Sequence, residues 1–288
     1  MLGTPGLYAQ LACIWEATAR KAGNVHRLQD FDNLTYMDFL NSAASIAPVF
    51  ETAQNQRVGA TVLQAIQATR QVCSTNTNLG MVLLFAPLAA VPAVAPLTKG
   101  LEGMLNNLNL QDAQDVFGAI RLAQPGGIGK VSEQDVSQPP TANLFEAMRL
   151  AADRDLVARQ YVTCFATVLQ EGLPELQEGL ARTGELETAI VLCHLHLLAR
   201  HGDSLIARKV GSDLAHQAQI QAQSVLSANF PLTEQGRAGF RDFDAWLRAD
   251  GHKRNPGASA DLTAACLFVA LREGIIQLPL QYSWTGGF

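Results

Sequence analysis

The stretch at residues 73–90 constrains the fold of this chain most strongly. Its second half, Met81–Ala86, is an unbroken apolar run, and its first half is a short polar group closed by Gly80. A helix that is apolar all round must be covered on nearly every side. We therefore expect a buried central helix at about residues 78–90, with the regular helix ending near Pro87 and a Pro- and Ala-rich connector after it.

The polar group that precedes this run contains Asn76, Thr77 and Asn78. Such residues commonly cap a helix start by accepting hydrogen bonds from its first N–H groups. The same N–H groups also favour anions, so a phosphate-bearing ligand could bind there. Taken alone, this stretch favours the capping role and leaves the ligand site as the alternative.

The composition indicates a globular protein and excludes several classes of function. Of the 288 residues, 48% are hydrophobic and 16% charged, and the formal net charge is -5. An acidic chain without a Lys/Arg cluster is not expected to bind nucleic acid. The apolar run from Met81 is interrupted by prolines and falls short of the usual membrane span, so no membrane association is expected.

The five cysteines are scattered and odd in number, which is typical of free thiols in a reducing compartment. The first residues do not combine a basic segment with an apolar one, so secretion is not expected. These features predict a cytoplasmic protein. The oligomeric state stays open, with a homodimer as one alternative.

Helical periodicity recurs along the chain, and no segment shows sustained period-two alternation. The sequence therefore predicts an all-α protein that folds as a single domain over residues 1–288. Besides the central helix, the expected helices are 8–21, 35–49, 58–72, 97–108, 112–122, 143–170, 186–200, 203–228, 236–249 and 259–274. Residues 123–140 are expected to form a loop, which could lie over a site.

Two charged segments could serve either structure or chemistry. In the first, Asp153 and Asp155 lie four residues from Arg149 and Arg159, which is typical of surface ion pairs on a helix. Because their other neighbours are mostly Ala and Leu, the two carboxylates could instead reach a cleft and a metal ion. The spacing does not decide between these roles.

In the second segment, Asp203 is the expected helix cap, and Arg208 and Lys209 follow in the second turn. The two cations could hold phosphates or simply be solvated. Gly211 costs about 1 kcal/mol of helix stability relative to Ala, so a close approach of another helix or a ligand is expected there.

A third polar segment precedes the last expected helix. Asn255-Pro256-Gly257 is typical of a turn, and Asp261 lies in the first turn of the helix that follows. Each residue has an ordinary structural role when taken singly. The number of such polar helix starts suggests instead that several of them converge on one site.

Other motifs are less informative. Gly126-Gly127-Ile128-Gly129-Lys130 lacks the spacing of a phosphate-binding loop and has no strand before it. His194 and His196 are two apart on a helix and point about 200° apart, so they cannot share a metal ion.

Taken in order, these segments resemble the triphosphoribosyl-dephospho-CoA synthase family, which serves citrate lyase and malonate decarboxylase. The resemblance covers about residues 8–277 and leaves residues 278–288 as a C-terminal tail that could dock on a partner subunit or cover the core. The motifs that carry it are Glu16…Lys21-Ala22-Gly23, Asn76-Thr77-x-x-Gly80, Asp153-x-Asp155-x-x-Ala-Arg-Gln-Tyr161, Asp203-Ser-Leu-Ile-x-Arg208-Lys209-x-Gly211 and Asn255-Pro256-Gly257-x-x-Ala-Asp261-Leu.

The resemblance implies an all-α transferase that moves the 5-triphosphoribosyl group of ATP to the 2′-hydroxyl of 3′-dephospho-CoA and releases adenine. It implies ATP and a nucleotide-like acceptor as partners. Three departures point to a divergent branch: Ala22 replaces the proline of a Lys-Pro-Gly motif, residues 26–32 lack a Gly-x-His-x-Asp-Met pattern, and Asn78 replaces a histidine. The alternatives are a related transferase acting on another cofactor precursor, such as a pterin intermediate of C1 metabolism, or a non-catalytic helical nucleotide-binding protein.

Within this resemblance each motif residue receives an expected role. Mg²⁺ on the triphosphate is expected to bind Asp153, Asp155, Asp203 and Asp261, with Asp155 and Asp261 also counted as catalytic. Glu16 is the candidate base, with a structural Glu16–Lys21 ion pair as the competing role. The residues expected to contact phosphate or nucleotide are Lys21, Gly23, Asn24, Asn76, Thr77, Asn78, Gly80, Arg208, Lys209, Asn255 and Gly257.

Overall fold

The computed structural model describes residues 3–126 and 133–284 and is almost entirely helical there. The first half of the chain forms α1 (Pro5–Thr18), α2 (Tyr36–Phe50), the short 3-10 helix η1 (Ala53–Asn55), α3 (Val58–Val72), α4 (Leu79–Ala90), α5 (Leu97–Asn106) and α6 (Leu110–Ala123). The second half forms α7 (Leu144–Ala151), α8 (Leu156–Val162), the π-helical segment η2 (Thr167–Gly172), α9 (Leu173–Thr183), α10 (Leu186–His201), α11 (Ser204–Val210), α12 (Ser212–Ser227), α13 (Glu234–Arg248), β1 (Ala249–His252) and α14 (Gly257–Arg272). The predicted all-α class is confirmed, with β1 as the one short strand in these ranges.

Two buried helices, α4 and α14, form the centre of the molecule. All but two residues of α4 are buried, as its apolar sequence predicts. The regular helix continues past Pro87 to Ala90, so the expected end near Pro87 is wrong. Packing against α3, α5 and α14 holds the helix together beyond the proline. The last helix, α14, is equally enclosed and packs against α1, α4, α8, α9, α10 and α11.

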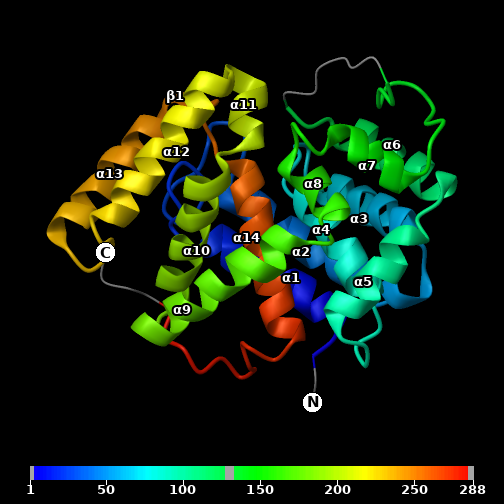
Figure 1. Cartoon of the computed structure of the whole chain (residues 1–288), viewed down its shortest axis with the longest axis horizontal. Coiled ribbons are helices and arrows are strands. Elements are labelled where there is room, and N and C mark those ends of the chain that lie inside the picture. The colour runs from blue at the N-terminus through cyan, green and yellow to red at the C-terminus, as the bar shows by residue number, and fades with distance from the viewer. Residues whose placement is uncertain (1–2, 127–132, 285–288) are drawn as a thin grey trace.

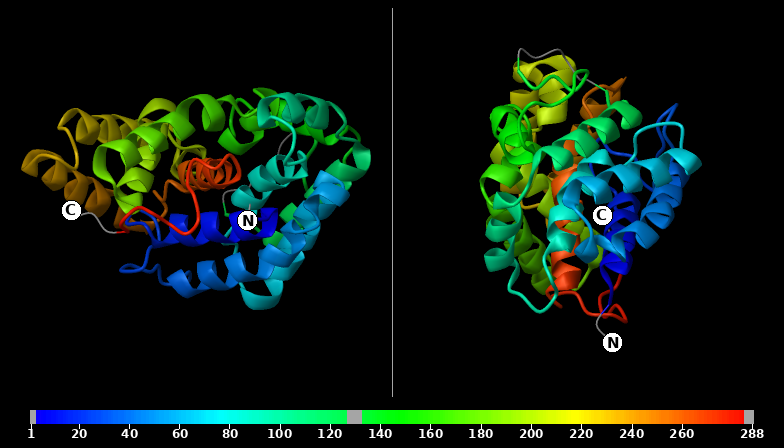
Figure 2. Two further views of the ribbon diagram at one scale, coloured as in Figure 1. Left: turned by 90° about the horizontal axis from the view of Figure 1, so that it is seen from below. Right: turned by 90° about the vertical axis from the view of Figure 1, so that its right-hand side faces the viewer.

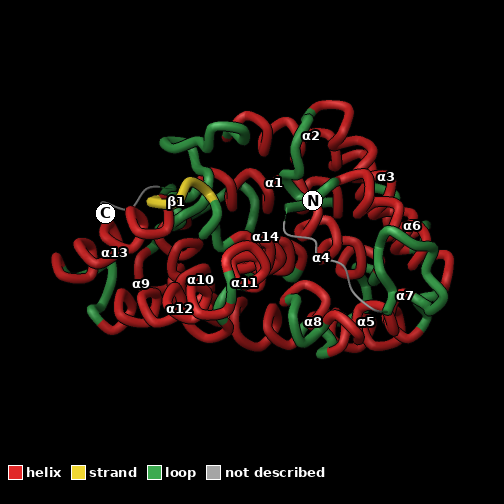
Figure 3. Tube along the Cα trace, turned by 90° about the horizontal axis from the view of Figure 1, so that it is seen from above, coloured by secondary structure: helices red, strands yellow, loops and turns green. Residues whose placement is uncertain are grey.

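The remaining helices surround α14 on all sides. Figure 1 shows α9, α10, α12 and α13 on one side of α14 and α3 to α8 on the other. Figure 3 looks nearly along α14, with α1 and α2 above it and α8, α10 and α11 below. The molecule is elongated, with α13 at one end and α3 and α6 at the other (Figure 2). Because the buried apolar residues form one continuous core, we propose that the chain folds as a single domain.

Two helices that the sequence analysis expected to be continuous are broken. The expected helix 143–170 ends at Ala151, restarts at Leu156 and passes into η2, and α9 follows where no helix was expected. The expected helix 203–228 breaks at Gly211, whose φ of 97° a helix cannot accommodate. The break before α8 falls at Asp155, since an Asp side chain offers the backbone N–H groups an alternative partner.

The C-terminal segment covers the protein's own surface. The N–H groups of Leu186 and Glu187 donate to the carbonyl oxygens of Ser283 and Trp284, and Ser283 N–H donates to Gly184 O. Tyr282 and Trp284 also pack against the core. This part of the tail therefore covers the core, which is one of the two roles expected for it.

No helix of the described chain is long and apolar enough to cross a bilayer. The five cysteines are free thiols. The glycine-rich stretch at 126–130 lies mostly outside the described residues.

Candidate active site

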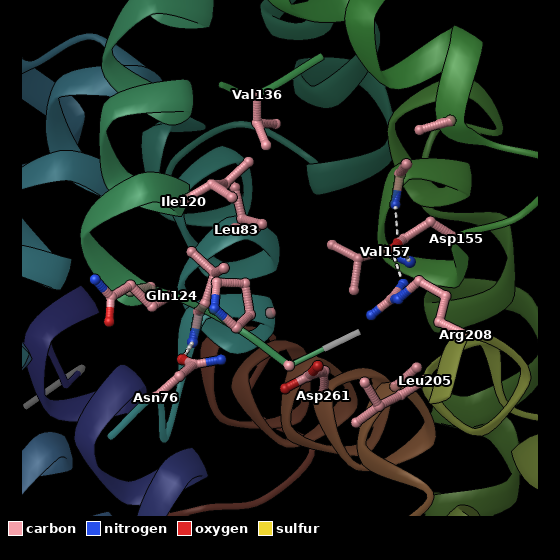
Figure 4. Close-up of a pocket in the computed structure, with 18 of the residues that line it drawn as sticks. Asn76, Leu83, Ile120, Gln124, Val136, Asp155, Val157, Leu205, Arg208 and Asp261 are labelled. Carbon is pink, nitrogen blue, oxygen red and sulfur yellow. Dashed lines mark hydrogen bonds and ion pairs between the residues drawn. The ribbon is translucent and has the colours of Figure 1, made fainter. Parts of the chain in front are cut away.

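A cavity of about 640 Å³ opens beside the start of α14, between α4, α6, α7, α8 and α11. Its volume lies within the range of small-molecule sites. Figure 4 shows Asp155, Arg208, Asn76 and Asp261 around it. Of the residues predicted from sequence, those that line the cavity are Asn76, Gly80, Asp155, Arg208, Lys209, Asn255 and Asp261.

Asp261 projects into this cavity from the fifth residue of α14, one position beyond the first turn in which it was expected. No hydrogen bond joins its carboxyl group to another described residue. Burial raises its pKa well above the usual range, and the negative charges of Glu16, Asp203 and Asp155 raise it further. A bound cation would relieve this repulsion, because an opposite charge favours the ionised carboxylate.

The turn before α14 contributes one polar side chain to the cavity. Asn255 lines it together with Asp261, and the buried Oδ1 of Asn255 has no hydrogen-bond partner among the described residues. Gly257 donates its N–H to Asn255 O at 2.9 Å and lies outside the cavity lining. The turn therefore presents an amide oxygen that a ligand could satisfy and uses its glycine for its own geometry.

The Asp155 side chain has two roles, since it caps a helix and forms an ion pair. Its Oδ1 accepts hydrogen bonds from the N–H groups of Val157 and Ala158, at 2.8 and 3.0 Å, and so begins α8. Its Oδ2 pairs with Arg208 of α11. The expected helix pair of Asp155 with Arg159 does not form, because Asp155 lies at the break in the helix. The pair with Arg208 instead fixes one cation and one carboxylate on the same wall of the cavity (Figure 4).

Asp203 and Asp153 lie outside the main cavity. Asp203 is buried; it caps α11 and accepts hydrogen bonds from the N–H and hydroxyl of Ser259, at 2.8 and 2.9 Å. These contacts tie α11 to α14. Asp153 is exposed and faces a second hollow of about 380 Å³, which Asp155 and Arg208 also line. The ion pair that sequence spacing allowed between Asp153 and Arg149 is replaced by one between Arg149 and Glu146.

Glu16 and Lys21 form a buried ion pair away from the cavity lining. Their side chains are 3% and 0% exposed, and Lys21 Nζ lies 2.9 Å from Glu16 Oε1. Lys21 also donates to the carbonyl oxygens of Glu16 and Ala19. Burial raises the pKa of Glu16, and Lys21 opposes that shift. The geometry favours the structural role that was weighed against catalysis by Glu16.

Gly23 and Asn24 also have structural roles, because both form hydrogen bonds within the protein. Gly23 N–H donates to Asp244 Oδ1 at 2.7 Å. The buried Asn24 amide donates to Ala22 O and lies 3.3 Å from Nε2 of His194. Neither residue lines the cavity.

The polar residues Asn76, Thr77 and Asn78 before α4 have two kinds of surroundings: the first lines the cavity, and the other two bond within the protein. Asn76 Oδ1 accepts a hydrogen bond from Leu79 N–H at 3.1 Å, and Asn76 also lines the cavity, so it serves as a cap at the site. Thr77 bonds to Ser42, and Asn78 exchanges hydrogen bonds with Thr69. Thr77 and Asn78 are buried among protein groups.

Several cavity residues were missed by the sequence analysis. Arg70 and Arg154 add two cations to the lining, and Phe31 and His252 add a stacked ring pair with centroids 5.1 Å apart. Arg154 stands between the two acidic residues of a motif already singled out, so its charge was the available signal. Phe31 comes from an irregular segment whose position no periodicity predicts.

The cavity fits a divalent cation only with help from a ligand. Among the described residues, no three His, Cys, Asp or Glu side chains gather closely enough to hold a metal ion. Mg²⁺ commonly binds one or two protein carboxylates together with substrate phosphates and water. Asp261 and Asp155 face the same cavity as the cations Arg208 and Lys209, which is the donor set that a magnesium–polyphosphate complex requires.

Comparison with known proteins identifies the family of this chain. The sequence profile of the ATP:dephospho-CoA triphosphoribosyl transferase family matches residues 3–278. The chain belongs to this family. Its elongated all-helical architecture also resembles a crystal structure from Archaeoglobus fulgidus that is described as a candidate triphosphoribosyl-dephospho-CoA synthase. That match has a TM-score of 0.64 and 29% identity, and it covers 82% of this chain and 99% of the other.

Two curated relatives have the same enzyme name. The 2-(5''-triphosphoribosyl)-3'-dephosphocoenzyme-A synthase of Klebsiella pneumoniae is 30% identical over 106 residues, which is 37% of this chain and 34% of the relative. A candidate synthase of Pseudomonas fluorescens (strain Pf0-1) is 30% identical over 115 residues, 39% of each chain. The aligned part thus spans less than half the length of either relative.

Proposed function

We propose that this family member transfers the 5-triphosphoribosyl group of ATP to the 2′-hydroxyl of 3′-dephospho-CoA and releases adenine. The observation that carries the proposal is the cavity in which Asp155, Arg208, Lys209 and Asp261 meet. The names of the matched relatives favour dephospho-CoA over a pterin precursor and favour a transferase over a non-catalytic binding protein.

The triphosphate would bind the cationic wall. Arg208 and Lys209 supply donors for phosphate oxygens, and Asp155 orients the Arg208 guanidinium through their ion pair. Mg²⁺, held by Asp155 and Asp261, would neutralise charge on the triphosphate when it is bound. Asp203, which was expected to be a further ligand, would instead support this wall by tying α11 to α14.

The reaction exchanges one bond at the anomeric carbon for another. The bond from that carbon to adenine breaks, the bond to the acceptor oxygen forms, the hydroxyl loses its proton and adenine gains one. Glycosyl transfer passes through an oxocarbenium-like state, which a nearby carboxylate such as Asp261 stabilises. Asn255 lines the cavity and offers an amide group that can orient a sugar.

The test is adenine release from ATP and Mg²⁺, measured by chromatography with and without dephospho-CoA, followed by mass analysis of the acceptor. We expect adenine only when dephospho-CoA is present and a product heavier by one triphosphoribosyl unit. Adenine release with a different acceptor alone, or ATP binding with no release under any condition, would contradict the proposal.

A further inference from the structure

The cavity has two walls of different chemistry. One wall carries the ion pair of Asp155 with Arg208 (Figure 4). The facing wall is apolar and is formed by α4, α6 and the segment before α7. We refer to it as the apolar wall, and its residues are Leu83, Ile120 and Val136, which Figure 4 labels. Val116 of α6 and Met148 of α7 are further apolar residues of the cavity lining.

Packing within the protein holds the side chains of the apolar wall in place. Leu83 and Met148 are 7% and 8% exposed, and Val116 is fully buried next to them, so packing within the protein fixes these side chains. Because burying apolar area gains roughly 25 cal/mol per Å², such a wall favours an uncharged, largely apolar part of a ligand. A phosphate group would lose hydration there without compensation.

A nucleotide triphosphate matches both walls at once, because it has a charged end and an uncharged flat base joined through the sugar. If the triphosphate bound Arg208 and Lys209, the sugar would lie near Asp261 and the base would face the opposite wall of the cavity. We infer that the apolar wall is the binding site for the purine base of ATP. This inference rests on the proposed function and adds the orientation of the donor nucleotide.

Two amide side chains stand at the edge of the apolar wall. Asn76 and Gln124 both line the cavity there (Figure 4). Asn76 uses its Oδ1 on Leu79 N–H, so its NH₂ group remains for a ring nitrogen of the base. Amide groups at the rim of an apolar surface are the usual means of orienting a heterocycle.

The wall also bears on how the base leaves. When the bond from the anomeric carbon to the base breaks, its electron pair stays on the purine. An apolar surface disfavours an anion, so the purine must take up a proton and leave as neutral adenine. The acceptor hydroxyl gives up one proton in the same reaction, so the protons balance.

The same cavity offers one competing place for a base. Phe31 stacks on His252, and the Arg248 guanidinium lies 5.9 Å from the Phe31 ring centroid. These two contacts already occupy Phe31, so we assign the base to the apolar wall. The assignment can be tested because the two places come from different segments of the chain.

Direct binding measurements separate the alternatives. The dissociation constants of ATP, inorganic triphosphate and dephospho-CoA are measured with Mg²⁺ by calorimetry for the wild type, I120W, V136W and F31L. Ile120 is on a helix, whereas Val136 is on an irregular segment and tolerates a large side chain more readily. A folded variant is identified by its retained binding of inorganic triphosphate.

We expect I120W and V136W to bind ATP at least tenfold more weakly and inorganic triphosphate unchanged, while F31L loses less ATP affinity than either wall variant. Loss of ATP affinity in F31L but not in the wall variants would overturn the inference, as would selective loss of dephospho-CoA binding in the wall variants. Failure of the proposed function would be visible separately, as an absence of adenine release with this binding pattern intact.

Discussion

The carboxyl group of Asp261 lies so close to α4 that a Cβ atom on Gly80 would fall 2.0 Å from its Oδ2. This contact joins the two central helices at the cavity, since Gly80 is the second residue of α4 and Asp261 the fifth residue of α14. The absence of a side chain at position 80 is therefore what allows Asp261 its place in the site.

Replacing Gly80 by Ala is expected to displace Asp261 and to lower kcat/KM for adenine release at least a hundredfold. The matched control is Gly103 of α5, where an added Cβ meets nothing within 4 Å. G103A is expected to keep full activity and to gain roughly 0.5–1 kcal/mol of stability from its better helix propensity. Equal activities of G80A and G103A would contradict the role given to this contact.

Replacing Asp261 by Asn removes the charge and keeps the shape. Because Asp261 is proposed to hold Mg²⁺ with the triphosphate, we expect D261N to lose turnover and the magnesium dependence of ATP binding. Calorimetric titration of ATP with and without Mg²⁺ measures this effect. Removing the cation with a chelator should abolish wild-type turnover and leave the circular dichroism spectrum unchanged. A D261N variant with wild-type magnesium dependence would exclude Asp261 as a ligand.

Asp155 has two separable roles, and two variants distinguish them. Asn is as good a helix cap as Asp, so D155N is expected to unfold at nearly the wild-type temperature and to lose triphosphate affinity with the Arg208 pair. D155A should also lose about 1 kcal/mol of stability, because the cap of α8 is lost. Denaturant unfolding and triphosphate binding of both variants check this. Equal stability of D155N and D155A would show that the cap contributes nothing.

The buried pair of Lys21 and Glu16 predicts a stability effect without a change of mechanism. K21M leaves the Glu16 carboxylate buried and unpaired, which should lower the free energy of unfolding by about 3–5 kcal/mol. The double variant K21M/E16Q should recover part of this loss. The surface pair of Arg149 with Glu146 is the control, since exposed pairs contribute at most about 1 kcal/mol. Urea unfolding measures all of these, and a loss in K21M no larger than that of the surface pair would contradict the prediction.

His194 predicts a pH dependence of stability. Burial, aided by the positive charge of Lys21, lowers the pKa of His194 to about 3 from its ordinary value of 6.5. Between these values the unfolded chain binds a proton that the folded chain does not, so the contribution of His194 to stability falls as pH falls from 6.5 toward 3. H194Q should lack this contribution.

The difference in stability between wild type and H194Q should therefore change by about 1.4 kcal/mol per pH unit between roughly pH 6 and pH 4. Urea unfolding at several pH values measures it. H216Q, at an exposed position on α12, is the control and should follow the wild-type pH dependence. Parallel curves for wild type and H194Q would rule out the effect.

The sequence alone predicted the all-α class and the buried helix α4, because a helix that is apolar on all sides must lie inside a core. It was insufficient at Asp155 and Gly211, where continuous helices were expected. In both places local backbone bonding competes with helix periodicity, and periodicity alone does not reveal which prevails. The short helices α8 and α11 are the result.

The candidate site could likewise be predicted only in part from the sequence. Motif order suggested that Asn76, Asp155 and Asp261 share one site, and all three line the same cavity. It did not tell which polar residues of a motif face inward to the core: Asn78 is close to Asn76 in sequence but bonds to Thr69. Such choices depend on the rotation of each helix start relative to its neighbours, which long-range packing sets.

The caps of α8 and α11 also bear on which relatives of this protein share its chemistry and which share only its fold. Asp155 and Asp203 each begin a seven-residue helix, and Asn or Ser would begin it equally well. A family member could thus have Asn or Ser in place of either Asp, keep the same fold and lose the carboxylate. Overall likeness of fold would not reveal that loss, whereas the residues at these two helix starts would.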